Sequence, residues 1–364
     1  MKRKQIRLSF IILVYLLLGC SQEPTRKNEL NFTEKDIPPA SMLKGHKFNF
    51  PEVLNPRGIS IVGNKAIVFE RKNTSDSKFH IIDLQEDTYL ISKGVDGMGP
   101  GEITVITQIE ALQDPRKILT YDPELNVFSV FDLSDSSRLA ERQFRAPDTA
   151  FFFTDAAFTS DTSFIAHLVD GWTKYLHLTI SGDTVSAFGN WKNMIEGREL
   201  PNGYKEEELD ANLVSNVFQG PLRVNNSRTY AVKAGLKVDY IDIVRLSDQS
   251  ITTLIGPEST IQDFRIGNTG GYQMPTFPPE TSTTRYRDVF AGENSFFVLF
   301  SGKSYSAISE MTDINRIFEF DYSGKPLAQY QLDFPLFGFA VDERNRRIYG
   351  VTTDQEPNLV RFDY

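Results

Sequence analysis

The sequence contains few of the residues that build disulfides or metal sites. Among 364 residues there is one cysteine, Cys20, and there are four histidines, His46, His80, His167 and His177. A single cysteine forms no internal disulfide, so the stability of the protein has to come from its packed core. The histidines lack the His-x-His and His-Glu-x-x-His spacings of zinc sites, although two of them, His167 and His177, fall in one expected hairpin where they can face each other. We interpret all four as ordinary strand residues, and the sequence predicts no metal and no cofactor.

Basic residues are fewer than acidic ones. The chain has 39 lysines and arginines against 48 aspartates and glutamates, which gives a formal net charge of −9. That charge becomes −13 if the four basic residues that precede Cys20 are removed with a signal peptide. A chain with this balance is not expected to bind nucleic acid, or to bind an anionic membrane through its charge.

The first residues indicate export and lipidation. Four basic residues, Lys2, Arg3, Lys4 and Arg7, precede an apolar stretch from Leu8 to Leu18. This stretch is too short to span a membrane as a mature helix. The stretch ends in Leu17-Leu18-Gly19-Cys20, which resembles the bacterial lipobox, in which a peptidase cuts before the cysteine and the cysteine is lipidated. The alternative is an ordinary secretory signal with a chance cysteine.

This pattern divides the chain into three parts. We predict a lipoprotein signal peptide over residues 1–19 and a flexible tether over residues 20–40, because the latter segment is polar and contains charges and prolines. Residues 41–364 form the folded domain. The lipid on Cys20 would be the only membrane attachment, so we expect a monomer in the cell envelope, on the inner or the outer membrane.

Six similar hairpins follow one another in the folded part. Each is a β-rich strand, a turn of Gly, Asn, Asp, Pro or Ser residues, and a second β-rich strand. The turns fall at residues 63–65, 113–117, 159–162, 225–228, 292–294 and 342–345. Third strands are expected at residues 79–84, 127–133, 175–181, 240–246, 316–322 and 359–364, and four of them end near an aspartate, namely Asp83, Asp132, Asp321 and Asp363. An all-strand repeat with spacings of 49 and 42 residues between these aspartates predicts a six-bladed β-propeller.

The last blade lacks a fourth strand, because the chain stops at Asp363-Tyr364. We predict that Lys47-Phe48-Asn49-Phe50, which precedes the first blade, supplies that strand and closes the ring without an open edge. Two separate β-sandwiches are the alternative, but the even repeat and the absence of a dividing linker disfavour them.

Several motifs resemble those of a known family. Asp96-Gly97-Met98-Gly99-Pro100-Gly101-Glu102 resembles the Gly-x-Gly-Pro-Gly-Glu turn between the first two blades of the TolB-like six-bladed propeller lipoproteins of Bacteroidetes. Gln219-Gly220, followed by a strand and Asn225-Asn226, resembles a second feature of these proteins. The resemblance extends over nearly all of residues 40–364 and implies the fold and a cell-envelope address, but no reaction and no catalytic residue. The glycines permit positive φ, and no Lys-Ser/Thr pair or helix follows, so we expect a structural turn rather than a nucleotide site.

Two long insertions are the best candidates for binding. Residues 191–217 include an expected short helix at Lys205–Leu209, and residues 270–287 carry Tyr272, Arg285, Tyr286 and Arg287. Arginine and aromatic residues on long loops are typical of recognition sites, so the first hypothesis is a non-catalytic protein that binds a protein, peptide or glycan through these four residues. The alternative is a loop that only plugs the mouth of the propeller.

A second hypothesis is a metal-assisted hydrolase or lyase. Glu70, Asp122 and Asp170 follow the second strands of the first three blades, with Arg71 and Lys72 beside the first of them. Convergence of three or more such groups on the axis of the ring would favour an enzyme. Separately, Asp148-Thr149-Ala150 and Asp183-Thr184-Val185 resemble acceptor sites for O-glycans in Bacteroidetes envelope proteins.

Overall fold

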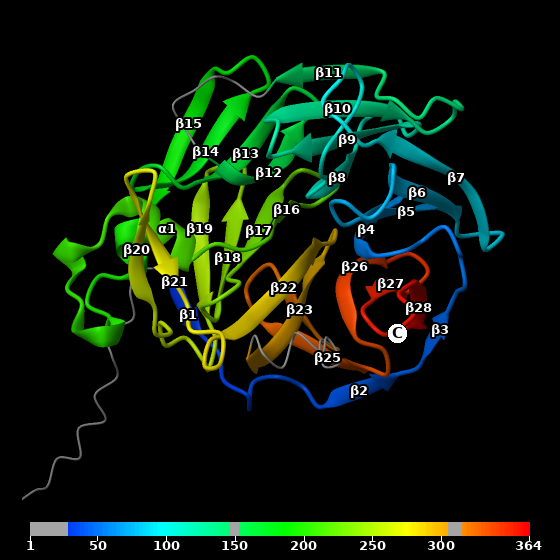
Figure 1. Ribbon diagram of the computed structural model, residues 1–364. Helices are drawn as coiled ribbons and strands as arrows, with labels where there is room; N and C mark the ends of the chain where they lie inside the picture. The colour runs from blue at the N-terminus through cyan, green and yellow to red at the C-terminus, as the bar shows by residue number, and fades with distance from the viewer. Residues whose placement is uncertain (1–27, 146–152, 305–314) are drawn as a thin grey trace, which may run out of the picture.

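The computed structural model describes residues 28–145, 153–304 and 315–364. Six antiparallel sheets stand in a ring like the blades of a propeller (Figure 1). The predicted six-bladed β-propeller is therefore confirmed. Cys20 and Thr149 lie outside the described residues.

Each blade is built from strands that follow one another in the chain, and the first strand of each blade contacts the first strand of a neighbouring blade at the centre of the ring. Blade 1 contains β4 (Pro56–Val62), β5 (Lys65–Glu70), β6 (Ser77–Asp83) and β7 (Thr88–Val95), and blade 2 contains β8 (Gln108–Ala111), β9 (Lys117–Asp122), β10 (Val127–Asp132) and β11 (Arg142–Arg145). Blade 3 contains β12 (Phe153–Ser160), β13 (Ser163–Leu168), β14 (Thr173–Thr179) and β15 (Thr184–Asn190), and blade 4 contains β16 (Leu222–Val224), β17 (Tyr230–Ala234), β18 (Tyr240–Arg245) and β19 (Ser250–Ile255). Blade 5 contains β22 (Thr283–Ala291), β23 (Ser295–Ser304), β24 (Arg316–Asp321) and β25 (Pro326–Leu332), and blade 6 begins with β26 (Leu336–Asp342), β27 (Arg347–Thr352) and β28 (Leu359–Asp363).

The fourth strand of blade 6 comes from the N-terminal part of the chain. Strand β3 (Gly45–Lys47) pairs antiparallel with β28, with His46 opposite Arg361. The Phe48 N–H continues the ladder by donating a hydrogen bond to the Leu359 carbonyl, 2.9 Å away. Closure by an N-terminal strand is thus confirmed, although the strand begins two residues earlier than predicted and ends at Lys47.

Two further N-terminal strands lie on the rim. Strand β1 (Glu29–Asn31) pairs in parallel with β19 of blade 4, and β2 (Ala40–Leu43) pairs in parallel with β25 of blade 5. Between them Phe32 is buried, with its ring 5.3 Å from that of Phe320. The structure therefore differs from the expected tether over residues 28–40, because the apolar side chains Phe32 and Ile37 fill the space between blades 4 and 5. Figure 1 shows this segment running around the outside of the ring.

The hydrophobic core lies mainly between neighbouring blades. Leu119 and Phe128 of blade 2 pack against Phe158 and Phe164 of blade 3, and the rings of Phe128 and Phe164 are 5.1 Å apart. Aromatic and β-branched residues suit this arrangement because they fill the space between two twisted sheets. The many phenylalanines of the sequence are therefore explained by the contacts between blades.

Three of the four repeated aspartates end the third strands by accepting hydrogen bonds from the next turn. Asp83 accepts from the Gln85 and Glu86 N–H groups at 2.8 and 3.0 Å, and these bonds lower the pKa of its carboxyl group. Asp132 and Asp321 accept in the same way from Ser134 and Ser323. Each aspartate thus caps a turn, as an Asx-turn residue does.

The glycine-rich turn at residues 96–102 joins blades 1 and 2. Gly101 has φ of +80°, which favours glycine, and a Cβ at Gly97 would lie 2.0 Å from the Glu102 carboxylate. That carboxylate accepts a hydrogen bond from the Gly99 N–H at 2.7 Å. The segment folds around Glu102 as a structural turn. Within the residues that the structure describes, no helix is long and apolar enough to cross a membrane.

Candidate functional site

The innermost strands surround a channel that opens into a cavity at each end. The bottom cavity, of about 940 Å³, lies where the inner strands end and is lined by residues such as Ile61, Glu110 and Asn345. The top cavity, of about 190 Å³, lies where the inner strands begin, and is lined by residues such as Arg57 and Phe337. Top here means the face on which the chain passes from the outer strand of one blade to the inner strand of the next.

A charged cluster lies between the two cavities, where Arg223 and Asp288, together with Phe69, line both of them. The Arg223 guanidinium lies 3.1 Å from Asp288 and 3.6 Å from Asp155, and it donates a 3.1 Å hydrogen bond to the side chain of Gln108. Burial alone would lower the pKa of Arg223, but the attraction of the two aspartates outweighs burial and raises it. The two carboxyl groups have raised pKa values, chiefly because they are buried. This cluster spans blades 2 to 5 and closes the middle of the channel.

The rim of the top cavity is basic. The guanidinium carbons of Arg71 and Arg287 lie 4.0 and 3.7 Å from the centre of the Phe337 ring, as in cation–π contacts. Arg57 begins blade 1 and lines the same cavity. Lys237 lies close by, and its pKa is lowered by burial and by the neighbouring Arg287 and Arg285. On a chain of negative net charge, this group of cations marks one end of the channel as an anion-attracting site.

A close approach of two backbone segments at Gly220 positions the Gln219 side-chain amide at this rim. A Cβ at Gly220 would lie 1.9 Å from the Ala234 carbonyl oxygen, so only glycine allows the two chain segments to approach. Gln219 precedes it and lines the top cavity. The Gln219-Gly220 pair thus places a polar side chain beside the arginines.

The comparisons with known proteins agree with this architecture. A family model for TolB-like six-bladed propellers matches residues 31–344. The chain belongs to this family. Among curated proteins, none matches the sequence.

A solved structure shares the fold of this TolB-like propeller. A Bacteroides fragilis protein named "Putative exported protein" is 12% identical, covers 92% of this chain and 98% of its own, and superposes with a TM-score of 0.55. The propeller domain of Myceliophteria thermophila Cps50 (Swd1) is 11% identical and covers 88% of this chain and 98% of its own, with a TM-score of 0.46.

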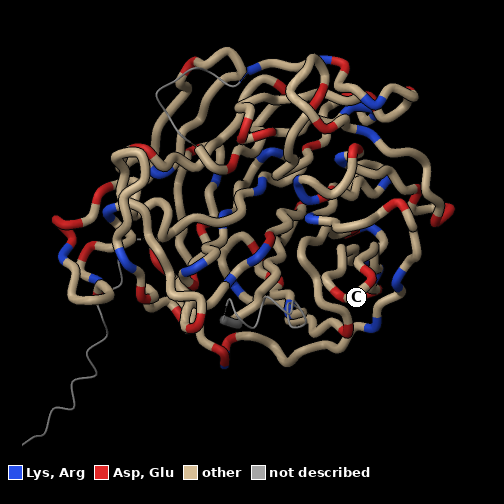
Figure 2. Tube along the Cα trace, viewed as in Figure 1, with Lys and Arg blue, Asp and Glu red and all other residues tan. Residues whose placement is uncertain are grey.

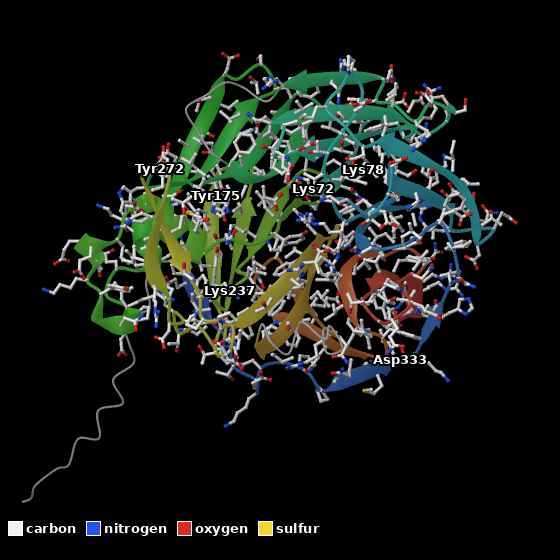
Figure 3. All side chains as sticks on the ribbon, in the orientation of Figure 1. Lys72, Lys78, Tyr175, Lys237, Tyr272 and Asp333 are labelled. Carbon is white, nitrogen blue, oxygen red and sulfur yellow. The ribbon has the colours of Figure 1, made fainter. Side chains whose placement is uncertain are left out.

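The four residues predicted to bind a ligand lie in separate settings of the TolB-like propeller. Tyr286 is fully buried and donates a 2.6 Å hydrogen bond to Asp239, and Arg285 is buried and paired with Glu258. Tyr272 is 49% exposed on a hairpin at the periphery of the ring (Figure 3). Only Arg287 reaches the top cavity. The four residues therefore do not form the single binding surface that the sequence predicted.

The physical reason is that the expected loop is largely strand. Residues 283–287 begin β22, so successive side chains point to opposite faces of the sheet. The preceding residues form the hairpin of β20 (Arg265–Thr269) and β21 (Tyr272–Thr276). The alternative of a plug also differs from the structure, since this hairpin packs beside α1 rather than in the channel mouth (Figure 1).

Both insertions form one lobe next to blade 4. It contains the 3₁₀ turns η1 (Trp191–Met194), η2 (Pro201–Gly203) and η3 (Glu206–Glu208), helix α1 (Ala211–Val217) and the hairpin β20–β21. The expected short helix at residues 205–209 is only the 3₁₀ turn η3, and the α-helix follows it, capped by the Asp210 side chain. The Asn212 side chain joins the two insertions by donating to the Gln273 carbonyl at 2.6 Å. From α1 the chain runs directly to Gln219 at the top cavity.

Two of the carboxylates proposed for catalysis accept hydrogen bonds from backbone N–H groups instead. Glu70 accepts hydrogen bonds from the Leu54 and Asn55 N–H groups at 2.8 and 2.7 Å, and Asp122 accepts from the Thr104 and Val105 N–H groups. Each carboxylate therefore fixes the loop that leads into the inner strand of its own blade. Asp170 lies apart from them, after β13. Within residues 28–145, 153–304 and 315–364, no three acidic, histidine or cysteine side chains are grouped as a metal site would require.

Arg71 and Lys72, the two basic residues that follow Glu70, have different interaction partners. Lys72 forms an exposed ion pair with Glu124 at 2.5 Å, whereas Arg71 stacks on Phe337. Figure 3 marks Lys72 near the centre of the ring. Arg71, proposed as a partner of a catalytic acid, is thus part of the basic rim.

The histidines are dispersed over the blades. His46 lies on β3, and His80 is buried between Glu70 and Tyr89. His167 and His177 do not face each other, because His167 pairs with Tyr175 and His177 pairs with Ile165. His167 is completely buried, while His177 contacts the Thr159 hydroxyl at 2.8 Å.

Sequence reasoning missed Arg57, Phe337 and Gln219 as members of one site. Each stands at or just before the start of an inner strand, so the alignment of the six hairpins carries the signal that places them together. Acidic and basic residues are interspersed along the chain (Figure 2), so charge counting alone does not reveal the cluster. Thr184, the other proposed glycan acceptor, is exposed at the start of β15, and its modification stays a prediction.

Proposed function

We propose that this protein is a lipid-anchored propeller of the cell envelope that binds a protein, peptide or glycan partner at the top face and performs no catalysis. The observation that carries the proposal is the basic rim of Arg57, Arg71 and Arg287 around Phe337 at one end of the channel. Arginine beside an aromatic ring is typical of recognition surfaces.

The surrounding structure supports binding rather than chemistry. Glu70 and Asp122 are held by backbone N–H groups, and Asp155 and Asp288 are held by Arg223 and backbone N–H groups. A general acid or base needs to reach a substrate proton, and these carboxylates are already occupied. The lobe beside blade 4 adds surface on the same face for a larger partner.

The envelope address rests on the first twenty residues. The signal-like stretch and the lipobox-like Leu17-Leu18-Gly19-Cys20 support export and lipidation, and the similar Bacteroides fragilis structure is also named as an exported protein. Cys20→Ala should abolish labelling by a radioactive or alkyne-bearing fatty acid, because the thiol is the acyl acceptor. Equal labelling of the variant and the wild type would contradict the proposal.

Partner capture tests the binding face. The purified protein, immobilised through its C-terminus, should retain one or more components of an envelope extract from the bacterium that produces it. Arg287→Ala should lose this capture while its thermal unfolding is unchanged, because Arg287 is only partly buried at the rim. Arg344→Ala, an exposed arginine at the bottom cavity, is the matched control. Capture that depends on Arg344 and not on Arg287 would place the binding face at the other end.

A further inference from the structure

The two carboxylates of the top cavity are hydrogen-bonded to groups other than Arg57. Asp155 accepts hydrogen bonds from the Leu222 and Ala156 N–H groups at 2.9 and 3.1 Å. Asp288 accepts from Arg223 and from the Phe339 and Val289 N–H groups, at 2.9 to 3.1 Å. Arg223 is the common partner of both carboxylates.

Arg57 is not one of these partners. Its partly buried guanidinium lines the top cavity but donates no hydrogen bond to any residue of the described ranges. Burial lowers the pKa of Arg57 and the neighbouring Arg223 lowers it further, while Asp155 and Asp288, neither of which accepts a hydrogen bond from it, offset only part of the effect. A cation that is removed from water without a hydrogen-bonded partner is costly, and an anion bound beside it removes that cost.

The size of the cavity restricts the anion to the end of a molecule. Pockets for whole drug-sized ligands enclose about 300–1,000 Å³, whereas the top cavity encloses about 190 Å³. Phe69, Arg223 and Asp288 form the floor that it shares with the bottom cavity. The cavity therefore suits one acidic group with a few carbon atoms attached.

The lining favours a peptide over a sugar. Leu236, Pro221 and Phe337 supply apolar surface for a side chain, and the Gln219 amide lies at the rim for a backbone group. Sugars commonly bind by stacking on an open aromatic face, but the Phe337 ring is already in contact with Arg71 and Arg287. These contacts also hold the two guanidinium groups at the rim, where they attract an anion.

We propose that the top cavity binds the C-terminal carboxylate of a peptide chain, with Arg57 as its principal partner. The planar guanidinium of arginine matches a carboxylate with two parallel hydrogen bonds, and capture of a free C-terminus is a known mode of peptide recognition. This inference rests on the proposed function, because it names the group that the top face recognises.

Two peptide pools test the inference. Random hexapeptides with free C-terminal carboxylates, and the same pool made as C-terminal amides, are equilibrated with the full mature protein and quantified by mass spectrometry. The wild type should retain the acids at least tenfold better than the amides. Arg57→Gln should remove that preference, and Arg57→Lys should retain only part of it, because lysine keeps the charge but not the fork of donors. Arg344→Gln should behave as the wild type.

The outcomes separate this inference from the proposed function. Equal retention of acids and amides by the wild type, or an undiminished preference in a folded Arg57→Gln variant, overturns the inference. Arg57-dependent retention of an oligogalacturonide in place of the peptides overturns it in favour of an acidic glycan. If the peptide test fails but capture from the envelope extract still depends on Arg287, the proposed function stands. The proposed function itself fails if the wild-type protein captures nothing from the extract. Thermal unfolding of each variant shows that binding, and not folding, has changed.

Discussion

At the scale of single residues, one arginine connects four blades. Arg223 of blade 4 reaches Gln108 of blade 2, Asp155 of blade 3 and Asp288 of blade 5. Asp288 in turn accepts the Phe339 N–H of blade 6 at 3.1 Å. The polar groups at the centre of the ring therefore act as a network between blades, and buried networks of this kind help to fix a single arrangement when every member is satisfied.

A second buried network lies between blades 3 and 4. Lys174 is 2.5 Å from Asp242, and Lys233 donates hydrogen bonds to the Phe218 carbonyl and the Tyr240 hydroxyl at 2.5 and 2.6 Å. Burial and the neighbouring Lys174 lower the pKa of Lys233 to about 7. The network holds two cations and one carboxylate, so Lys233 is the member whose charge is least compensated.

Stability should therefore depend on pH through Lys233. Its folded pKa of about 7 lies below its usual value of 10.5, so between these values the unfolded chain binds more protons and stability rises with pH. From pH 7 to 9 the wild type should gain about 2 kcal/mol relative to Lys233→Met. Tyr240 still donates to the Phe218 carbonyl in that variant. Urea unfolding at both pH values measures the difference, and Lys35→Met, at an exposed lysine, is the control. A pH dependence shared by all three proteins would contradict the assignment.

Residue types alone predicted the binding site poorly. Arg285, Tyr286 and Arg287 have the composition of a recognition loop, but their place in β22 sends them to different environments. Tyr286 packs in the core and Arg285 pairs with Glu258, so neither reaches the channel. The rim residues come from positions distant in sequence, and only the ring brings Arg57 next to Phe337.

At the scale of elements, the repeat predicted the strands closely. The third strands begin at or within two residues of their expected positions in all six blades. They are rich in aromatic and β-branched residues, and four of them end at an aspartate. The N-terminal segment was the main difference. Strands β1 and β2 are short and largely exposed. They are stabilised by pairing with distant blades, which a local sequence pattern does not reveal.

Phe32 tests whether residues 28–40 belong to the fold. Its ring is 5% exposed and packs on Phe320, so Phe32→Ala should lower the free energy of unfolding by about 3–5 kcal/mol. Met42→Ala, in β2 of the same N-terminal segment but 71% exposed, should change it by less than about 0.5 kcal/mol. Urea denaturation of the mature protein gives both values. Equal stability of the two variants would mean that the segment is a tether after all.

At the scale of the whole molecule, blade 6 joins the C-terminal strand to a strand from the N-terminal part of the chain. Strand β3 closes the ring against β28, so residues 45–47 and 360–362 support each other although they are far apart in the sequence. The anchor predicted at Cys20 precedes this closing strand by about twenty-five residues of chain, of which residues 28–44 run along the rim. If Cys20 carries the proposed lipid, only residues 21–27 separate it from the described part of the chain, and the ring would be held near the membrane.

The strand that closes the ring, β3, and the extra strand on the rim, β2, should contribute differently to stability. Hydrogen-bonded pairs alternate along an antiparallel ladder, and Phe48 is bonded to Leu359, so His46 is bonded to Arg361 two residues away. His46→Pro removes this donor from the strand that completes blade 6 and should cost on the order of 2 kcal/mol. Ser41→Pro is the matched control, because β2 is a fifth strand and blade 5 keeps four strands without it. Differential scanning calorimetry should show a clearly larger fall in Tm for His46→Pro. If Ser41→Pro lowers Tm as much, the rim strands are as essential to the ring as the closing strand, and the shared-blade account of its stability is wrong.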